Sequence, residues 1–119
     1  MLIGGVDMRT QALQLATSPH IVIATPGRMA DHIRSSGEDT VGGLRRAKMV
    51  VLDEADRMLS ETFADDLGEC LDILPKGGVA GRQTLLFTAT MTDEVKALKA
   101  MELEAGRREV FVCEVDTDK

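Results

Sequence analysis

Aromatic side chains are scarce in these 119 residues, which contain three phenylalanines and no tryptophan or tyrosine. Proteins that bind single-stranded nucleic acid often stack its bases on aromatic rings, so this chain has no evident platform for that kind of recognition. The formal net charge of −6 also excludes a generally basic nucleic-acid-binding surface. Any nucleic-acid contact is therefore expected to be local, made to the backbone by particular arginines and main-chain amides.

Cysteine and histidine are equally scarce. Cys70 and Cys113 lie far apart and in no CxxC pair, which predicts two reduced thiols of an intracellular protein and neither a metal site nor a structural disulfide. His20 and His32 are too isolated to suggest a metal centre, so ordinary structural or surface roles are expected for both. Long apolar runs and a cleavable leader are missing too, which predicts a soluble protein with no membrane span and no secretion signal.

Short apolar runs alternate with helical patterns along the whole chain, which is typical of one α/β domain with a parallel sheet covered by helices on both faces. In the first helix, Met8, Ala12, Leu13 and Leu15 are expected to face inward. Residues 35–43 are polar and contain glycine, which predicts a loop. Strands are predicted at 1–3, 20–24, 49–52, 84–87 and 110–115, and helices at 7–16, 26–34 and 63–74 and from Thr92 past Met101.

The central segment begins with Met49–Leu52, four apolar residues that predict a strand buried on both faces. Asp53 and Glu54 follow directly, at the carboxyl edge where open α/β sheets bind their ligands. One carboxylate there can hold a hydrated Mg²⁺ ion, and its neighbour can orient or deprotonate an attacking water. The alternative is that Asp53 merely caps a helix that begins at Glu54, with Asp56 stabilised by the helix dipole.

Three further polar clusters follow predicted strands, and they are Gly4-Gly5, Thr25-Pro26-Gly27-Arg28 and Thr88-Ala89-Thr90. Because the carboxyl ends of parallel strands meet at one edge of a sheet, all four clusters are expected to share that edge. A bare glycine amide and a helix amino end are natural phosphate sites, and Arg28 adds a positive charge. Taken singly, the three clusters also have plain interpretations as a turn, a helix start and a strand exit.

In this order and spacing, the four clusters resemble the motifs of the first RecA-like domain of DEAD-box RNA helicases, which has a P-loop NTPase fold. The resemblance covers nearly the whole chain, 1–119, but only the latter part of that domain. Residues 23–36 and 83–92 are most similar to the subgroup associated with ribosomal RNA processing. The resemblance thus implies a role in ribosome biogenesis, and the expected compartment is intracellular, with the nucleus or nucleolus as candidates.

The resemblance also implies roles for the matching residues. Asp53 would engage Mg²⁺ through water on the phosphates of ATP, and Glu54 would position and activate the hydrolytic water. Asp56 would couple the nucleotide site to Thr88-Ala89-Thr90, whose hydroxyls link hydrolysis to strand separation; the family usually has serine in place of Thr88. The positions that grip the RNA sugar-phosphate backbone fall on Gly4, Gly5, Thr25, Pro26, Gly27 and Arg28.

The sequence also departs from the family pattern. No GxxxxGK[ST] phosphate loop occurs in the 119 residues, and the glycine-rich segment 77–82 has neither its spacing nor its lysine. By the same resemblance, the adenine-reading segment and the second RecA-like domain, with its arginine finger, are expected to lie outside these 119 residues. In the family the phosphate-loop strand lies beside the strand that here ends at Phe87. This strand and the last one are therefore expected to lack a partner and to leave open edges.

Three hypotheses follow from the sequence. The first is a fragment of an ATP-dependent RNA helicase that couples ATP hydrolysis to RNA unwinding or remodelling and is inactive by itself. The second is a non-catalytic module that binds RNA or docks to a complete helicase. The third, an unrelated doubly wound domain such as a flavodoxin-like regulator, requires all four motifs to be coincidence.

Overall fold

The computed structural model describes residues 1–75, 82–104 and 110–114. The chain divides into two compact units, of which the first contains Met1–Arg46 and Asp65–Leu74 and the second Ala47–Ala64 and Pro75–Lys119. The chain thus leaves the first unit after residue 46 and returns to it for ten residues before it completes the second. Within the described ranges, no helix is long and apolar enough to cross a membrane.

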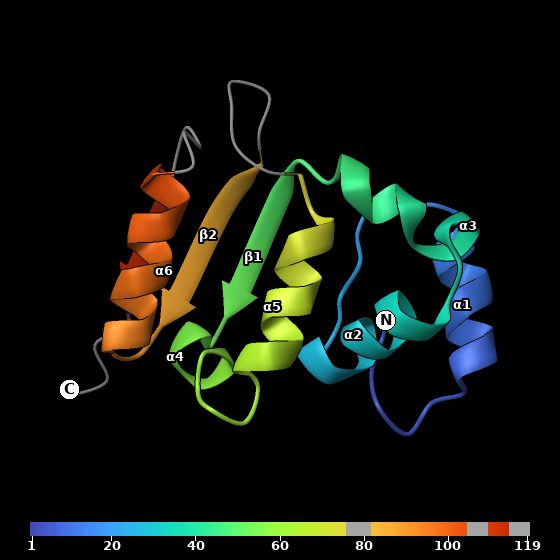
Figure 1. Cartoon of the computed structure of the whole chain (residues 1–119), viewed down its shortest axis with the longest axis horizontal. Coiled ribbons are helices and arrows are strands. Elements are labelled where there is room, and N and C mark those ends of the chain that lie inside the picture. Colours follow the sequence, from blue (N-terminus) through green and yellow to red (C-terminus); the bar gives the residue numbers. More distant parts are fainter. Residues whose placement is uncertain (76–81, 105–109, 115–119) are drawn as a thin grey trace. The chain divides into compact units, whose positions relative to one another are not determined.

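The first unit consists mainly of helices (Figure 1). They are α1 (Met8–Ala16), α2 (Pro26–Ser35), α3 (Glu38–Val41), the 3₁₀ helix η1 (Gly42–Arg46) and all but the first residue of α5 (Ala64–Ile73). α1 begins after Asp7, whose carboxylate accepts hydrogen bonds from the main-chain nitrogen and the hydroxyl of Thr10 at 3.2 and 2.9 Å. α2 begins at Pro26 directly after Thr25, as the sequence predicts.

The strands predicted over 1–3 and 20–24 are both reduced to a single parallel bridge between Leu2 and Ala24. Ile21 and Ile23 are 80% and 61% exposed, so the prediction of a buried strand is wrong. A strand becomes buried on both faces only where neighbours extend its ladder and other layers cover it. In the described part of the chain, the ladder of this segment stops after one bridge, and an apolar run alone cannot reveal that.

The buried side of α1 also differs from the prediction. Gln11 and Leu15 are buried, whereas Leu13 is 69% exposed. Residues four positions apart share one face of a helix, and a residue two positions away points to the opposite side. The sequence interpretation missed this face because it counted only apolar residues. Gln11 is polar, but its amide can be buried because it forms hydrogen bonds inside the protein.

The loop predicted over 35–43 is wrong as well, because this stretch contains α3 and the start of η1. Glu38 lies in the first turn of α3, where the helix dipole favours a negative charge, and its carboxylate pairs with Arg45 at 2.6 Å. Val41 and Leu44 are buried and lie three positions apart. This short helical pattern was hidden among polar residues.

The second unit contains a parallel three-stranded sheet in the order β1-β2-β3. Its elements are β1 (Met49–Asp53), α4 (Ala55–Met58), β2 (Gln83–Thr88), α6 (Asp93–Glu104) and β3 (Val110–Glu114). β1 and β2 run side by side in the same direction in Figure 1. α4 contacts β2, and α6 contacts β3 and α4. The predicted α/β class with a parallel sheet is confirmed.

The strand that ends at Phe87 does not lack a partner, which corrects the prediction of an open edge there. β2 is hydrogen-bonded to β1 on one side and to β3 on the other, with the pairs running from Thr84 and Val110 to Thr88 and Glu114. α6 connects β2 to β3, as parallel strands require a crossover. The chain therefore closes this side of β2 with its own last strand. The predicted inward side chain of Met101 and the strand end at Val115 lie outside what the structure describes.

β1 is buried on one face only, so the prediction of burial on both faces is wrong. Leu52 is buried on the same face as Thr84 and Leu86 of β2, whereas Met49 and Val51 are 56% and 52% exposed. Successive side chains of a strand point to opposite faces, and a continuous apolar run hides this alternation. The core of the second unit therefore lies on one side of β1.

Leu86 and Leu13 test the observed core. We expect Leu86→Ala to lower the free energy of unfolding by about 3 kcal/mol, because Leu86 is completely buried and its loss leaves a cavity. Leu13→Ala removes the same atoms from an exposed helix position and should change stability by less than about 0.5 kcal/mol. Urea denaturation followed by circular dichroism measures both, and equal losses would contradict the described burial.

Candidate functional site

The acidic segment, Asp53-Glu54-Ala55-Asp56, lies where β1 ends and α4 begins. Asp53 is the last residue of β1, and Glu54 follows in the left-handed region with φ 56° and ψ 52°. Non-glycine residues seldom adopt this conformation, which turns the chain sharply between the strand and Ala55, the first helical residue. The residue in the cap position is therefore Glu54 and not Asp53, and its side chain makes no capping hydrogen bond. This corrects the capping alternative and leaves the Glu54 side chain 69% exposed at the turn.

The carboxylate of Asp53 is exposed at the end of the strand, and no described residue forms a hydrogen bond or ion pair with it. Hard carboxylate oxygens suit Mg²⁺, which binds through one or two carboxylates and leaves its other positions to water and phosphate oxygens. The described ranges contain no group of three or more side chains that could hold a metal ion. Asp53 is thus a residue that could hold a hydrated Mg²⁺ ion, and its assignment to one stays a prediction.

A hydrogen bond joins the acidic segment to the threonine cluster after β2. The hydroxyl of Thr90 donates to Oδ2 of Asp56 at 2.9 Å, while Oδ1 accepts from the main-chain nitrogen of Arg57 at 3.0 Å. The bond from Thr90 lowers the pKa of Asp56 below its ordinary value, so this carboxylate stays ionised. The buried Thr88 in turn donates its hydroxyl to the carbonyl of Thr90 at 2.7 Å. The exits of two neighbouring strands are thus linked by side chains.

The other two predicted clusters lie together in the first unit. Gly4 and Gly5 are exposed, and nothing lies within 4 Å of where a Cβ atom would stand on either. Gly5 has a φ of +80°, which only glycine adopts without strain. The bridge between Leu2 and Ala24 places the Gly4-Gly5 turn and the Thr25–Arg28 segment shortly after two residues that are paired with each other. Of the four clusters, the structure therefore pairs two in each unit.

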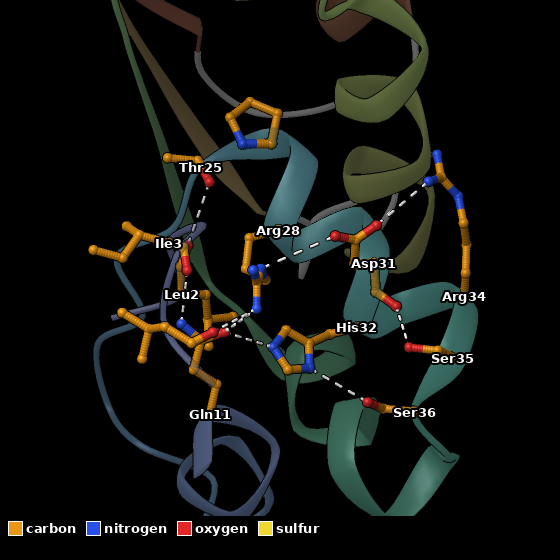
Figure 2. A network of polar contacts seen from close by, with 12 residues as sticks. Leu2, Ile3, Gln11, Thr25, Arg28, Asp31, His32, Arg34, Ser35 and Ser36 are labelled. Atoms are coloured by element: carbon orange, nitrogen blue, oxygen red, sulfur yellow. Dashed lines mark hydrogen bonds and ion pairs between the residues drawn. The ribbon is translucent and has the colours of Figure 1, made fainter. Parts of the chain in front are cut away.

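Arg28 is not a free surface cation. Its side chain is 15% exposed, and Nη1 donates to the carbonyl of Val6 at 2.8 Å and to Oε1 of Gln11 at 3.4 Å. Its Nε lies 4.0 Å from Oδ2 of Asp31, and Figure 2 shows the guanidinium directed toward Gln11 and Asp31. The same figure shows Gln11 next to His32, which is completely buried. The sequence interpretation assigned no function to Gln11 or His32. The four-residue spacing of Gln11 and Leu15 on α1 could have indicated that Gln11 faces the interior.

Residues 1–98 match the family model of the DEAD/DEAH box helicases. The chain belongs to this family. It is 59% identical to an ATP-dependent RNA helicase DBP8 of Gibberella zeae, 63% identical to the dbp8 of Botryotinia fuckeliana and 58% identical to the dbp-8 of Neurospora crassa. These alignments cover 98%, 98% and 100% of this chain, but 22%, 22% and 19% of the relatives. The chain spans about a fifth of the length of the curated relatives it matches.

The family membership confirms the resemblance drawn from the four clusters, and with the parallel sheet it supports a partial RecA-like domain. It excludes the hypothesis of an unrelated doubly wound domain. The individual roles of the acidic, threonine and glycine residues stay predictions, because the match concerns the chain as a whole.

Removal of the Thr90 hydroxyl tests the link between the two strand exits. In Thr90→Val we expect the pKa of Asp56 to rise toward its ordinary value, because the hydrogen bond that stabilises the carboxylate is lost. Thr90→Ser keeps a hydroxyl and should keep the lowered pKa. Carboxyl-carbon NMR titration of the three proteins measures the shift, and an unchanged Asp56 titration in Thr90→Val would rule out the bond in solution.

Proposed function

We propose that the chain is part of an ATP-dependent RNA helicase that couples ATP hydrolysis to RNA unwinding or remodelling. The observation that supports this most directly is the hydrogen bond between Asp56 and Thr90, which joins the acidic segment to the threonine cluster. Relatives with the name ATP-dependent RNA helicase align with almost the whole chain. A link of this kind is what coupling requires, since movement at one strand exit is passed directly to the other.

In this proposal the acidic residues divide the hydrolytic work. Asp53 would hold Mg²⁺ through water, and the ion would neutralise charge on the phosphates of ATP. Glu54, exposed at the left-handed turn, would orient the attacking water and accept its proton. Asp56 would transmit the state of this site to Thr88-Ala89-Thr90 through the Thr90 hydroxyl.

The triphosphate itself must be held in part by residues outside this sequence. No GxxxxGK[ST] segment occurs in the 119 residues, and the backbone amides and lysine of such a loop are what cradle the phosphates. A second RecA-like domain is the further partner that the proposal requires. We therefore expect the 119-residue chain to be inactive as an ATPase by itself.

The first unit would bind RNA through its sugar-phosphate backbone. The Gly4-Gly5 turn is exposed, with open space where a side chain would stand on either glycine, and the amino end of α2 carries a positive partial charge. The residues assigned to this site are Gly4, Gly5, Thr25, Pro26, Gly27 and Arg28. A role in ribosomal RNA processing, in the nucleus or nucleolus, belongs to the same proposal.

A non-catalytic module that binds RNA or docks to a complete helicase is the alternative. It is supported by the exposed Gly4-Gly5 turn and by the amino end of α2, which could bind RNA without any action on ATP. The two proposals differ in whether the acidic segment ever acts on ATP.

A chimera distinguishes them. We would replace the aligned segment of the Neurospora crassa dbp-8, which is 58% identical, with this chain. The catalytic proposal predicts RNA-stimulated ATPase activity in the chimera, and Glu54→Gln should lower kcat about a hundredfold or more because the base that accepts the water's proton is lost. Glu61→Gln changes another exposed glutamate of the same unit and should leave kcat unchanged. Equal ATPase activity of the Glu54→Gln chimera and the unmodified chimera would contradict the catalytic proposal and favour the non-catalytic module.

RNA binding is tested on the 119-residue chain directly. Fluorescence anisotropy with labelled single-stranded RNA should show an association constant that falls with salt by about 0.7 logarithmic units per tenfold change for each phosphate contacted. Arg28→Ala should weaken binding about tenfold, because it removes a charged group held within the site. Arg9→Ala, on the exposed side of α1, is the matched control. No binding by the unmodified chain at low salt would contradict an RNA site in this unit.

A further inference from the structure

Two polar side chains in the first unit are buried although no role in the proposed function uses them. Gln11 is 1% exposed, and His32 is completely buried. Burial of an amide or an imidazole costs free energy unless hydrogen bonds replace the lost water. Each therefore needs partners inside the protein, and the identity of these partners shows what the pair does.

The hydrogen bonds fix the orientation of Gln11. Its Nε2 donates to the carbonyl of Ile3 at 2.9 Å, and its Oε1 faces Nη1 of Arg28 at 3.4 Å and Nε2 of His32 at 3.1 Å. A carbonyl only accepts and a guanidinium only donates, so a flipped amide would face both with the wrong atom. The side chain of Gln11 thus has one orientation that satisfies its surroundings.

This orientation also determines the tautomer of His32. Because Oε1 of Gln11 only accepts, Nε2 of His32 must carry the proton that lies between them. Nδ1 is then free to accept from the hydroxyl of Ser36, which lies 3.3 Å away. Burial lowers the pKa of His32, and the nearby charge of Arg28 lowers it further, so the ring is neutral near pH 7. The neutral ring matches the hydrogen bonds that it makes.

The network holds the glycine turn at both ends. Gln11 bonds the carbonyl of Ile3, just before Gly4-Gly5, and Arg28 bonds the carbonyl of Val6, just after them. Gln11 and Arg28 also contact each other, and Arg28 belongs to the first turn of α2. Figure 2 shows Gln11 between the segment of Ile3 and the side chains of Arg28 and His32. The turn is thereby attached to the amino end of α2 by side chains as well as by the main-chain bridge.

We propose that Gln11 and His32 are positioning residues that lock the Gly4-Gly5 turn and the amino end of α2 into one site for consecutive phosphates of an RNA strand. The inference rests on the proposed RNA-binding function of these two segments. Arg28 acts in it as the link between the segments. Two anion sites held at a fixed separation bind one strand far more tightly than either binds alone, because the second contact becomes intramolecular.

A titration of the full 119-residue chain tests this. Main-chain amide NMR signals of Gly5 and Gly27 are followed as an oligouridylate of about ten nucleotides is added at low salt. In the unmodified chain both amides should report one dissociation constant. In Gln11→Met, which keeps side-chain volume but removes the hydrogen bonds, the two amides should titrate apart, with Gly5 weakened about fivefold or more. Gln14→Met, at an exposed position of the same helix, should behave as the unmodified chain.

Variants of His32 provide a second test of the proposal. This test is decisive if the Gln11→Met protein does not fold. His32→Gln places an amide N–H near the position of Nε2 and should keep a single dissociation constant. His32→Leu, which has no donor, should separate the two titrations, while His20→Leu at an exposed position should not. Thermal denaturation of each variant shows whether the change in titration occurs without loss of the fold.

The outcomes separate the inference from the function on which it rests. Separate titrations in Gln11→Met or His32→Leu, with a melting temperature close to that of the unmodified chain, support the positioning role. A single unchanged dissociation constant in every folded variant overturns it and leaves RNA binding intact. If the unmodified chain shows no shift at either glycine, the proposed RNA site itself fails.

Discussion

The parallel pairing of β1 with β2 is the constraint on which the candidate nucleotide site depends. In this register Asp53 lies opposite Phe87, so the residues that follow each strand leave the sheet next to each other. Asp56 can then accept a hydrogen bond from the hydroxyl of Thr90, although 34 positions separate the two residues in the sequence. A shift of one residue would turn every side chain of the strand to the other face and break this contact.

In the first unit, side-chain hydrogen bonds hold the candidate RNA-binding segments in place. It has a single bridge between Leu2 and Ala24 where the second unit has a ladder, so main-chain pairing alone holds its turn weakly. Buried side-chain hydrogen bonds from Gln11 and Arg28 supply the missing constraint. Polar groups in a core are satisfied in few geometries, and they therefore specify an arrangement more strictly than apolar contacts of the same size.

Much of the local structure could be predicted from the sequence, because local signals determine it. Thr25 followed by Pro26 starts α2, and Thr92 caps α6 through the main-chain nitrogen of Val95 at 3.3 Å. The failures concern burial. Ile23 and Val51 are apolar yet more than half exposed, and Gln11 is polar yet buried, because exposure depends on the neighbours that the chain brings together.

By itself, the sequence determined the order of the four polar clusters, the scarcity of aromatic residues and the family that these features resemble. Such features depend only on the kinds of residues and their order along the chain, so they are visible in the linear sequence. Only the tertiary structure decided that Arg28 is held inside the first unit, that β3 completes the pairing of β2, and that Asp56 and Thr90 meet. Hydrogen bonds form between groups that are close in space, and the distances that matter here exist only after the chain has folded.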